Sequence, residues 1–398
     1  MIDRPDFDLD RRRLIELVGM AAGGVLLETA LAGCSSVVRR DVDAEPASST
    51  ALPDLVAILL HEAALAPSSH NSQPWRVVVH DSTNLAIHAD ITRALADIDP
   101  AQRELRLSLG AFIENLVIAA EARALACRVD LADGDDLRQP VAEIRLTPGP
   151  PSGYPIDRLR RRCTVRRGLR PTSLPRSVIA ALSAADPTTI HFVPAGGPVA
   201  VAIAEATLEA FRQQTARDSA QLELAHWMRF SNDAARAHRD GLTTASLGIT
   251  GLSGWYVRHF YDDDDVMTSG FRDRSIDLTA SQLREGAGWF VVTSRDAQPA
   301  SIVDAGRVFQ RLGLLACDRG VGLHPMSQAL EESPYRGQLV DHLGVAGVPQ
   351  FVVRAGLVDT YPAPTTLRRP VGMFASAPVA SRANRHVRAH SSPPAPGT

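Results

Sequence analysis

The segment APSSHNSQPW, from Ala66 to Trp75, concentrates short hydroxyl and amide side chains between two prolines. Ser68, Ser69 and Asn71 can hydrogen-bond nearby backbone and so hold an irregular turn. The backbone N–H and C=O groups of such a turn are then free to meet the edge of a planar ring. An ordinary capped loop between a helix and a strand has the same composition, so the residues alone leave both interpretations open.

A second segment, RRCTVRR, alternates arginine with threonine between Arg161 and Arg167. Alternate side chains of an extended chain share a face, so Arg162, Thr164 and Arg166 are predicted to point the same way, roughly 6.5–7 Å apart. Two guanidinium groups flanking a hydroxyl suit a phosphate and the sugar-like chain next to it. Together the two segments offer what a flavin mononucleotide (FMN) needs. A basic surface strand is the alternative.

The composition narrows the classes of function. The chain has 398 residues, of which 45% are hydrophobic and 22% charged, and its net charge is −3, so it can bury a sizeable core and shows no sign of a nucleic-acid partner. All 42 basic residues are arginine, which excludes a lysine Schiff base and a P-loop lysine. The four cysteines and twelve histidines lack metal-ligand spacing, so we expect no metal site.

The N-terminal residues have the layout of an export signal. Arg11 and Arg12 precede a stretch of apolar or small residues, Leu17 to Leu27, and an LAGC sequence that ends at Cys34. Eleven such residues are too few for a bilayer-spanning helix, which needs about 20. The pattern resembles a twin-arginine signal with a lipobox, which predicts an exported protein anchored to the membrane through lipid on Cys34. An amphipathic helix on a cytoplasmic protein is the alternative.

Hydrophobic periodicity predicts alternating helices and strands. We expect helices over 52–65, 105–127, 175–185, 198–215 and 302–321, and strands over 75–80, 141–146, 190–193, 288–293 and 350–355. The two long helices resemble each other, because each has a glycine near its start, an apolar run and a cysteine near its end. This predicts two α+β units of similar plan packed around both helices, unless the similarity arose by chance.

The chain therefore divides into predicted regions. After the signal, residues 35–51 form a polar linker, residues 52–150 the first half and residues 151–375 the second half. Residues 216–275 break the pattern with aromatic residues and an acidic run, and we interpret them as an insertion that covers a site or as ordinary solvated helices and loops. Residues 376–398 are rich in Pro, Ala, Ser and Arg, which predicts disorder.

Three motifs resemble those of the nitroreductase family. APSSHNSQPWR resembles its flavin-binding loop, Arg162-x-Thr164-x-Arg166 its phosphate and ribityl motif, and TLRRP its terminal phosphate-binding arginine segment. Ordinary members are homodimers in which the arginine motif comes first. Here the loop comes first and each motif occurs once, which resembles the single-chain, double-length Acg-type branch. The resemblance implies a monomer whose two nitroreductase-like α+β halves form an intramolecular pseudo-dimer around buried central helices.

The resemblance also implies which residues contact FMN. On the ring side they are Pro67, Ser68, Ser69, Asn71, Met326 and Ser327, and on the phosphate and ribityl side Arg162, Thr164, Arg166, Arg368 and Arg369. Of these, Arg166 would reach the ribityl chain and the N1/O2 edge, where a guanidinium stabilises the negative charge of the reduced ring. No side chain is expected to act as a catalytic nucleophile, because hydride passes through flavin N5.

Three functions remain open from the sequence. The first is an FMN-dependent oxidoreductase that takes hydride from NADPH or NADH and reduces a nitro compound, a quinone or a similar small acceptor. The second is a flavin storage or sequestration protein without NAD(P)H turnover, which export favours because these donors are cytoplasmic. The third is a lipid-anchored interaction module that has lost the cofactor, which the intact motifs argue against.

Overall fold

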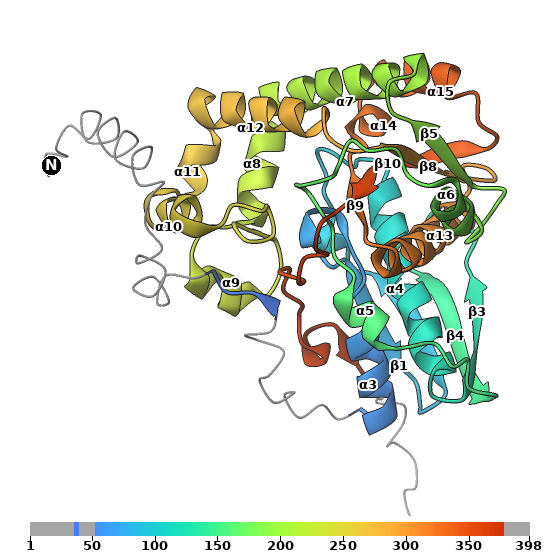
Figure 1. Cartoon of the computed structure of the whole chain (residues 1–398). Helices are drawn as coiled ribbons and strands as arrows, with labels where there is room; N and C mark the ends of the chain where they lie inside the picture. The colour runs from blue at the N-terminus through green and yellow to red at the C-terminus, as the bar shows by residue number, and fades with distance from the viewer. Residues whose placement is uncertain (1–35, 40–51, 378–398) are drawn as a thin grey trace, which may run out of the picture.

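Two β-sheets and two long helices form the body of the protein, in a computed structural model that describes residues 36–39 and 52–377 (Figure 1). The first sheet has the order β11-β1-β2-β4-β3 and is antiparallel except for β11. Its strands are β1 (Trp75–Val79), β2 (Asn84–Ala89), β3 (Leu125–Leu131), β4 (Pro140–Pro148) and β11 (Ala375–Ser376). The second sheet, β5-β8-β10-β9, is antiparallel throughout. Its strands are β5 (Ile190–Pro194), β8 (Gly288–Ser294), β9 (Val321–Pro325) and β10 (Val348–Leu357).

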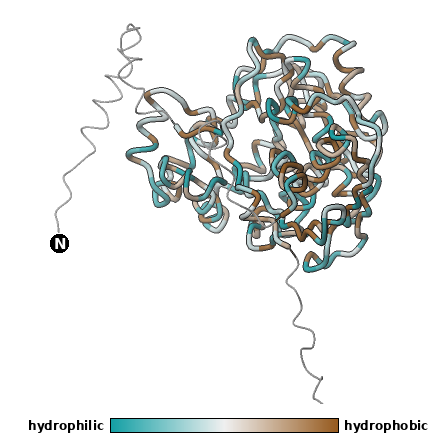
Figure 2. The backbone as a smooth tube through the Cα atoms, turned by 90° about the horizontal axis from the view of Figure 1, so that it is seen from below, coloured by the Kyte–Doolittle hydropathy of each residue, from teal (hydrophilic) through white to brown (hydrophobic). Residues whose placement is uncertain are grey.

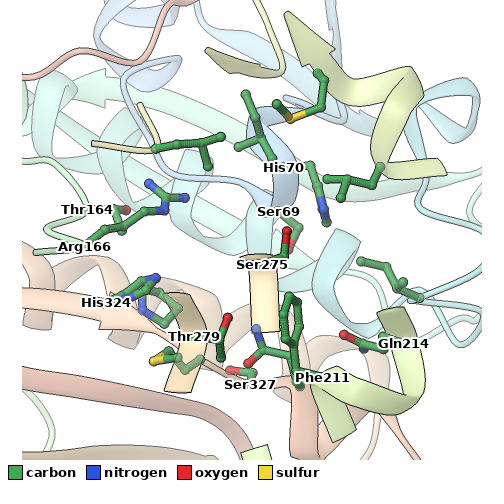
Figure 3. A pocket seen from close by; sticks show the side chains of 18 of the residues that line it. Ser69, His70, Thr164, Arg166, Phe211, Gln214, Ser275, Thr279, His324 and Ser327 are labelled. Carbon is green, nitrogen blue, oxygen red and sulfur yellow. The ribbon is translucent and has the colours of Figure 1, made fainter. Parts of the chain in front are cut away.

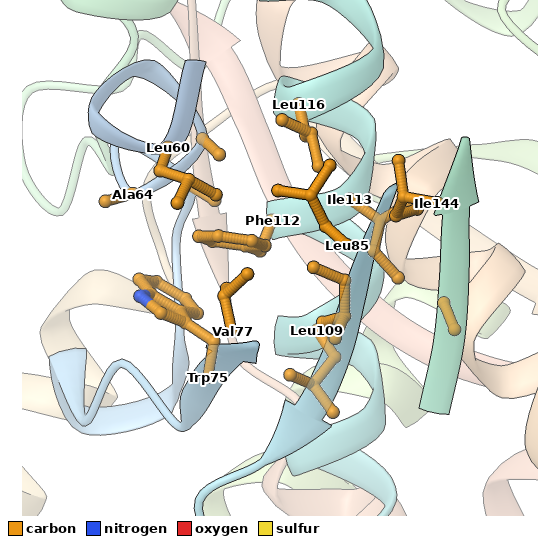
Figure 4. Packing of buried hydrophobic residues seen from close by; sticks show 14 of the residues in the cluster. Leu60, Ala64, Trp75, Val77, Leu85, Leu109, Phe112, Ile113, Leu116 and Ile144 are labelled. Atoms are coloured by element: carbon orange, nitrogen blue, oxygen red, sulfur yellow. The ribbon is translucent and has the colours of Figure 1, made fainter. Parts of the chain in front are cut away.

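Each sheet is covered by one of the long helices. Helix α4 (Arg103–Glu121) packs on the first sheet and α13 (Pro299–Asp318) on the second. In the first core, Trp75 begins a strand whose alternate residues are buried, and its ring lies 4.9 Å from that of Phe112 on α4 (Figure 4). The α+β class predicted from the sequence is confirmed.

The two long helices touch at reciprocal glycines. A Cβ atom on Gly110 of α4 would overlap the Val303 carbonyl of α13, and one on Gly306 of α13 would overlap the Leu107 carbonyl of α4. Only glycine permits so close an approach of two backbones. The glycine near the start of each predicted helix is therefore a requirement of the helix–helix contact.

Both long helices end earlier than their apolar patterns predict. Helix α4 ends at Glu121, and Ala124, with φ of 59°, turns the chain into β3. The helix predicted over 105–127 is therefore wrong in its last residues, which belong to β3. Helix α13 stops at Asp318, and Gly320, with φ of 62°, leads into β9. A left-handed residue ends a helix, whereas an apolar run fits a buried strand as well as a buried helix.

Further helices surround this body. They are α3 (Asp54–Ala63), the 3-10 turn η2 (Ser69–Asn71), η3 (Ile91–Arg93), α5 (Asp157–Arg161), α6 (Arg176–Ser183), α7 (Pro198–Ala216), α14 (Gln328–Glu331), α15 (Tyr335–Leu343) and η4 (Val371–Met373). One of them, α7, is as long as α4. The predicted helix and strand positions agree with α3, α6, α7, β1, β4, β5, β8 and β10. Strands β2, β3 and β9 had no prediction.

The predicted insertion forms a separate lobe beside the body (Figures 1 and 2). Its elements are α8 (Asp218–Trp227), β6 (Met228–Arg229), α9 (Asn232–His238), β7 (Leu242–Thr243), α10 (Gly251–Phe260), α11 (Asp263–Val266) and α12 (Ser269–Gln282). The lobe has a small apolar core of its own, which includes Met228, Phe230 and Val266. Because α12 continues to Gln282, the irregular region extends past its predicted end at residue 275.

The chain ends tie the two halves together. Strand β11 pairs with β1, so the end of the predicted second half completes the sheet of the first half. Of the predicted linker, residues 36–39 are described, and the Val37 N–H donates to Asn232 Oδ1 at 3.0 Å. The predicted signal with Cys34, and the tail beyond residue 377, lie outside the described residues. Within the described ranges, no helix combines the length and apolar character that a membrane span requires.

Candidate functional site

A cavity of about 540 Å³ lies where the body meets the insertion (Figure 3). The body contributes the APSSHNSQPW loop, the RRCTVRR segment, the start of α4 and the chain that follows β9. The insertion contributes mostly apolar side chains, among them Leu224, Met228, Phe230, Leu242 and Phe271. Segments that are far apart in the sequence therefore enclose one site.

The loop takes the irregular conformation that its residues predict. His70, Asn71 and Gln73 all have positive φ, between 50° and 53°. Ser68 holds the turn, because its hydroxyl accepts a hydrogen bond from the Gln73 N–H at 2.9 Å. Pro67, Ser68 and Ser69 line the cavity, as does His70, which the sequence analysis had not selected.

Asn71 and Arg368 lie outside the cavity lining and lock the loop from within the protein. The Asn71 amide donates to the carbonyls of Gly241 and Leu367, each at 3.2 Å, and its Oδ1 accepts from Arg368 at 2.9 Å. Arg368 also donates to the carbonyl oxygens of Leu65 and Ala66. The buried Asn71 side chain is therefore occupied by protein partners.

Arg369 holds the far end of the same loop. Its backbone N–H donates to Gln73 Oε1 at 2.8 Å, and its guanidinium donates to the carbonyls of Gln73 and Trp75. Arg369 is buried and, like Arg368, does not line the cavity. Their expected part in binding a phosphate stays a prediction, whereas their part in bracing the loop is visible in these contacts.

The arginine–threonine segment is only partly directed at the cavity. Thr164 and Arg166 line it, but Arg162 is buried against Gly313 of α13 and does not. The segment follows α5 directly and is not part of a sheet, although the Val165 N–H donates to the Leu323 carbonyl at 2.9 Å. Without a regular strand, the alternation that predicts one shared face for all three side chains does not extend to Arg162.

Arg166 is a partly buried cation with one hydrogen-bond partner among the described residues. Its Nη1 donates to the Ser246 carbonyl at 2.8 Å, and no carboxylate of the described residues pairs with it. Burial lowers the pKa of Arg166 to about 10, so the group keeps its charge at neutral pH. A partly buried positive charge that lines a cavity without a counter-ion favours an anionic ligand.

The HPMSQ segment, residues 324–328, begins at the end of β9 and continues along the cavity wall. His324, Met326 and Ser327 all line the cavity, so the two residues that the resemblance suggests here, Met326 and Ser327, lie at the site. Arg354 donates to His324 Nδ1 at 3.1 Å. Because a guanidinium only donates, Nδ1 must accept and the imidazole is neutral, with its proton on Nε2. Burial and the charges of Arg166 and Arg354 lower the pKa of His324 well below its usual value.

Two carboxyl groups at the site were missed from the sequence. Glu104 and Glu331 both line the cavity, beside Ser69 and Gln214. Each lies near the end of a helix, and the sequence cannot distinguish such an acidic residue from a solvated surface position. Their proximity comes from the packing of α4 and α14, which lie more than 200 residues apart in the chain.

Comparison with known proteins adds relatives but no family model, because none of the family models matches the chain. A Serratia protein named NAD(P)H nitroreductase PigM is 24% identical over 326 residues, which cover 74% of this chain and 86% of that protein. A Mycobacterium tuberculosis protein named NAD(P)H nitroreductase acg is 25% identical over 341 residues, covering 80% and 94%.

Solved structures of nitroreductases overlap the chain more loosely. The FMN-dependent nitroreductase NfnB from Mycobacterium smegmatis, solved with NADPH, covers 57% of this chain and 97% of its own, with 17% identity and a TM-score of 0.36. A nitroreductase from Anabaena variabilis covers 81% and 95%, with 13% identity and the same TM-score. The sequence similarity to PigM and acg extends over most of all three chains, so the protein is similar along most of its length to proteins named as NAD(P)H nitroreductases.

Proposed function

We propose that the protein binds FMN in this cavity and uses it to pass hydride from NADPH or NADH to a nitro compound, a quinone or a similar small acceptor. The observation that carries the proposal is Arg166, a partly buried cation that lines the cavity and has no carboxylate partner among the described residues. The relatives named as NAD(P)H nitroreductases support the same class of reaction.

The residues around the cavity fit such a ligand. A volume of about 540 Å³ lies within the range of small-molecule sites. The body offers hydroxyl groups and a positive charge, from Ser68, Ser69, Thr164 and Arg166, and the insertion contributes mostly apolar side chains. A nucleotide with a planar ring and a phosphate requires both kinds of surface.

When bound, FMN would supply the two-electron chemistry that no side chain of this protein can perform. Arg166 would stabilise negative charge on its bound partner, and it needs no rearrangement to do so because the Ser246 carbonyl already fixes its guanidinium. The braced loop would present Ser68 and Ser69 in a fixed position. The apolar wall of the insertion would keep water from the site.

The proposal is tested by titrating FMN into the flavin-free protein and following the quenching of flavin fluorescence. We expect about one FMN per chain and a dissociation constant at least tenfold larger in Arg166→Gln, because a charge-assisted hydrogen bond contributes about 1.5–3 kcal/mol. Arg167→Gln is the matched control, since the neighbouring Arg167 is exposed and does not line the cavity. Wild-type protein that binds no flavin would contradict the proposal.

Flavin storage without turnover is the second candidate function, because the insertion contributes much of the cavity wall, mostly with apolar side chains. Anaerobic mixing of the FMN-loaded protein with NADPH or NADH separates the two. Loss of the flavin absorption band within seconds supports turnover. A band that only dithionite bleaches supports storage.

We also propose that the protein is exported and anchored through Cys34, and that it acts as a monomer. Expression with and without Cys34→Ala, followed by membrane fractionation and mass spectrometry of the released protein, tests the anchor. A wild-type chain that stays in the soluble cytoplasmic fraction would rule it out. Sedimentation of the FMN-loaded protein tests the monomer.

A further inference from the structure

Glu104 and Glu331 present their carboxyl groups to each other at the cavity wall. The two side chains are 12% and 9% exposed, and each has a carboxyl oxygen within 4.0 Å of the same Arg103 Nη2. Glu104 also bonds the Ser69 hydroxyl, and the Gln214 amide donates to Glu331 at 2.7 Å. Figure 3 labels Ser69 and Gln214 on the wall of the pocket.

One positive charge, that of Arg103, lies beside the two carboxyl groups, so we expect one of them to be protonated. Arg103 Nη2 lies 3.0 Å from Glu104 but 4.0 Å from Glu331, so its charge stabilises the carboxylate of Glu104 more strongly. Two buried carboxylates that share a single nearby cation repel each other, and this repulsion favours a proton on one of them. Because Arg103 favours the charged form of Glu104, the proton belongs to Glu331.

The other titratable groups near the pair do not change this count. His70 lies close to Glu104, but burial lowers its pKa to about 4, so it is neutral at pH 7. Asp99 faces Glu104 from the N-terminal side of α4, and burial raises its pKa to about 6. Arg336 of α15 lies near Arg103, and Gln214 of α7 is neutral. Burial, and then the charge of Glu104, raises the pKa of Glu331 well above its usual value.

We propose that the carboxyl pair Glu104–Glu331 stores one proton at the cavity wall and donates it to the acceptor during its reduction. The proposal rests on the proposed function, because reduced FMN is the hydride source. An acceptor that takes up hydride gains two electrons and one hydrogen nucleus, and needs one more proton. For a quinone, the O–H bond of Glu331 breaks and an O–H bond of the hydroquinone forms. For a nitro group, hydride and this proton give the nitroso group and water.

Among the described residues, the cavity wall has few other groups that could donate a proton to the acceptor. Most side chains that the insertion contributes to the cavity wall are apolar and cannot supply a proton, whereas a protonated Glu331 can. After donation the pair holds two negative charges close together, which favours rapid uptake of a new proton from water. A positioned general acid of this kind accelerates a reaction by about 10²–10⁴-fold.

The first arm of the test needs no flavin. Infrared spectra of the flavin-free protein at pH 7 should contain the C=O band of a protonated carboxyl group that shifts in D₂O. The band should disappear in Glu331→Gln. It should remain in Glu332→Gln, because Glu332 is ion-paired with Arg217 at 2.8 Å and does not line the cavity. A wild-type spectrum without the band, or a band unchanged in Glu331→Gln, would overturn the stored proton.

The second arm measures the acceptor half-reaction by stopped flow. In Glu331→Gln, reoxidation of the reduced protein by a quinone should be about 100-fold slower and should lose its dependence on pH, while FMN affinity stays as in the wild type. Glu331→Asp, which keeps a carboxyl group, should recover part of the rate. Equal rates in the wild type and Glu331→Gln would overturn the donor role. Failure of the proposed function is seen separately, as absence of FMN binding in all variants.

Discussion

At the scale of single residues, two arginines that the motifs assign to phosphate binding also hold the cavity loop in place by hydrogen bonds. Arg368 donates to the carbonyls of Leu65 and Ala66 and to Asn71 Oδ1, all of them buried. Arg369 does the same for Gln73 and Trp75. The loop that lines the cavity is thus held by a segment from the other end of the chain.

Replacement of Arg368 by methionine should therefore destabilise the protein. The change leaves several buried carbonyl oxygens without a donor, and each unsatisfied group costs about 1–3 kcal/mol. We expect the free energy of unfolding in urea to fall by about 3 kcal/mol or more. Arg319→Met is the control, because Arg319 is exposed and bonds only a carbonyl of its own helix. Equal stability of the two variants would show that the loop does not depend on Arg368.

His324 predicts a pH dependence of stability. Its pKa is lowered in the folded protein, so the unfolded chain binds the proton more tightly and stability is lost as pH falls below about 6.5, the ordinary value for histidine. His324→Gln should remove this loss. Between pH 6.5 and pH 5 the two unfolding free energies should therefore converge or cross, with a relative slope of up to about 1.4 kcal/mol per pH unit. Parallel curves from urea titrations at each pH would refute the neutral, buried histidine.

The sequence predicts the site residues that are local and misses those that packing brings in. Ser68 and Ser69 could be selected because an irregular loop of small polar residues is a local property. Arg162 illustrates the limit, because its direction depends on how the chain leaves α5. Glu104 and Glu331 could not be paired without knowing that α4 and α14 meet.

At the scale of elements, the backbones of α4 and α13 approach each other closely where the two helices cross. The two glycines at this crossing are reciprocal, since each faces a backbone carbonyl of the other helix. Next to them, Gln310 donates to Asn115 Oδ1 at 2.6 Å in the buried interface. The interface between the two helices therefore combines close backbone approach with a buried polar contact.

Gly110→Ala should push the two helices apart. Its Cβ would overlap the Val303 carbonyl, which is backbone and cannot rotate away. We expect a loss of about 3 kcal/mol or more in the free energy of unfolding, although alanine is the better helix former. Gly337→Ala on α15 is the control, because no atom lies within 4 Å of its Cβ, and it should gain up to about 1 kcal/mol. A gain in both variants would mean that the helices move apart at no cost.

The positions of elements were more predictable than their ends. Strand β1 could be predicted because its valine run alternates buried and partly exposed residues. The end of α4 could not, because the apolar residues continue into β3 and the reversal depends on a non-glycine residue, Ala124, in the left-handed region. Such a conformation is imposed by the packing of the strand on its sheet rather than by the local sequence.

At the scale of the whole molecule, the two halves exchange parts. The chain crosses back from the second half so that β11 pairs with β1, and the Val77 N–H donates to the Phe374 carbonyl at 2.8 Å. Phe374 is 4% exposed and packs edge-on against Phe112 of α4. The first half therefore lacks an edge strand and a core side chain unless the C-terminal segment is in place.

This exchange predicts that the two halves unfold as one unit. Removal of the Phe374 side chain should cost about 3–5 kcal/mol, since it leaves a cavity in the first core. In native-state hydrogen exchange, Phe374→Ala should lower the protection of Ile87 in the first sheet and of Val291 in the second by the same free energy, because neither sheet is stable without the other. Phe260→Ala, at a side chain 52% exposed in the insertion, should change neither. If only Ile87 lost protection, the halves would be independent domains, and the shared helices α4 and α13 would not couple them.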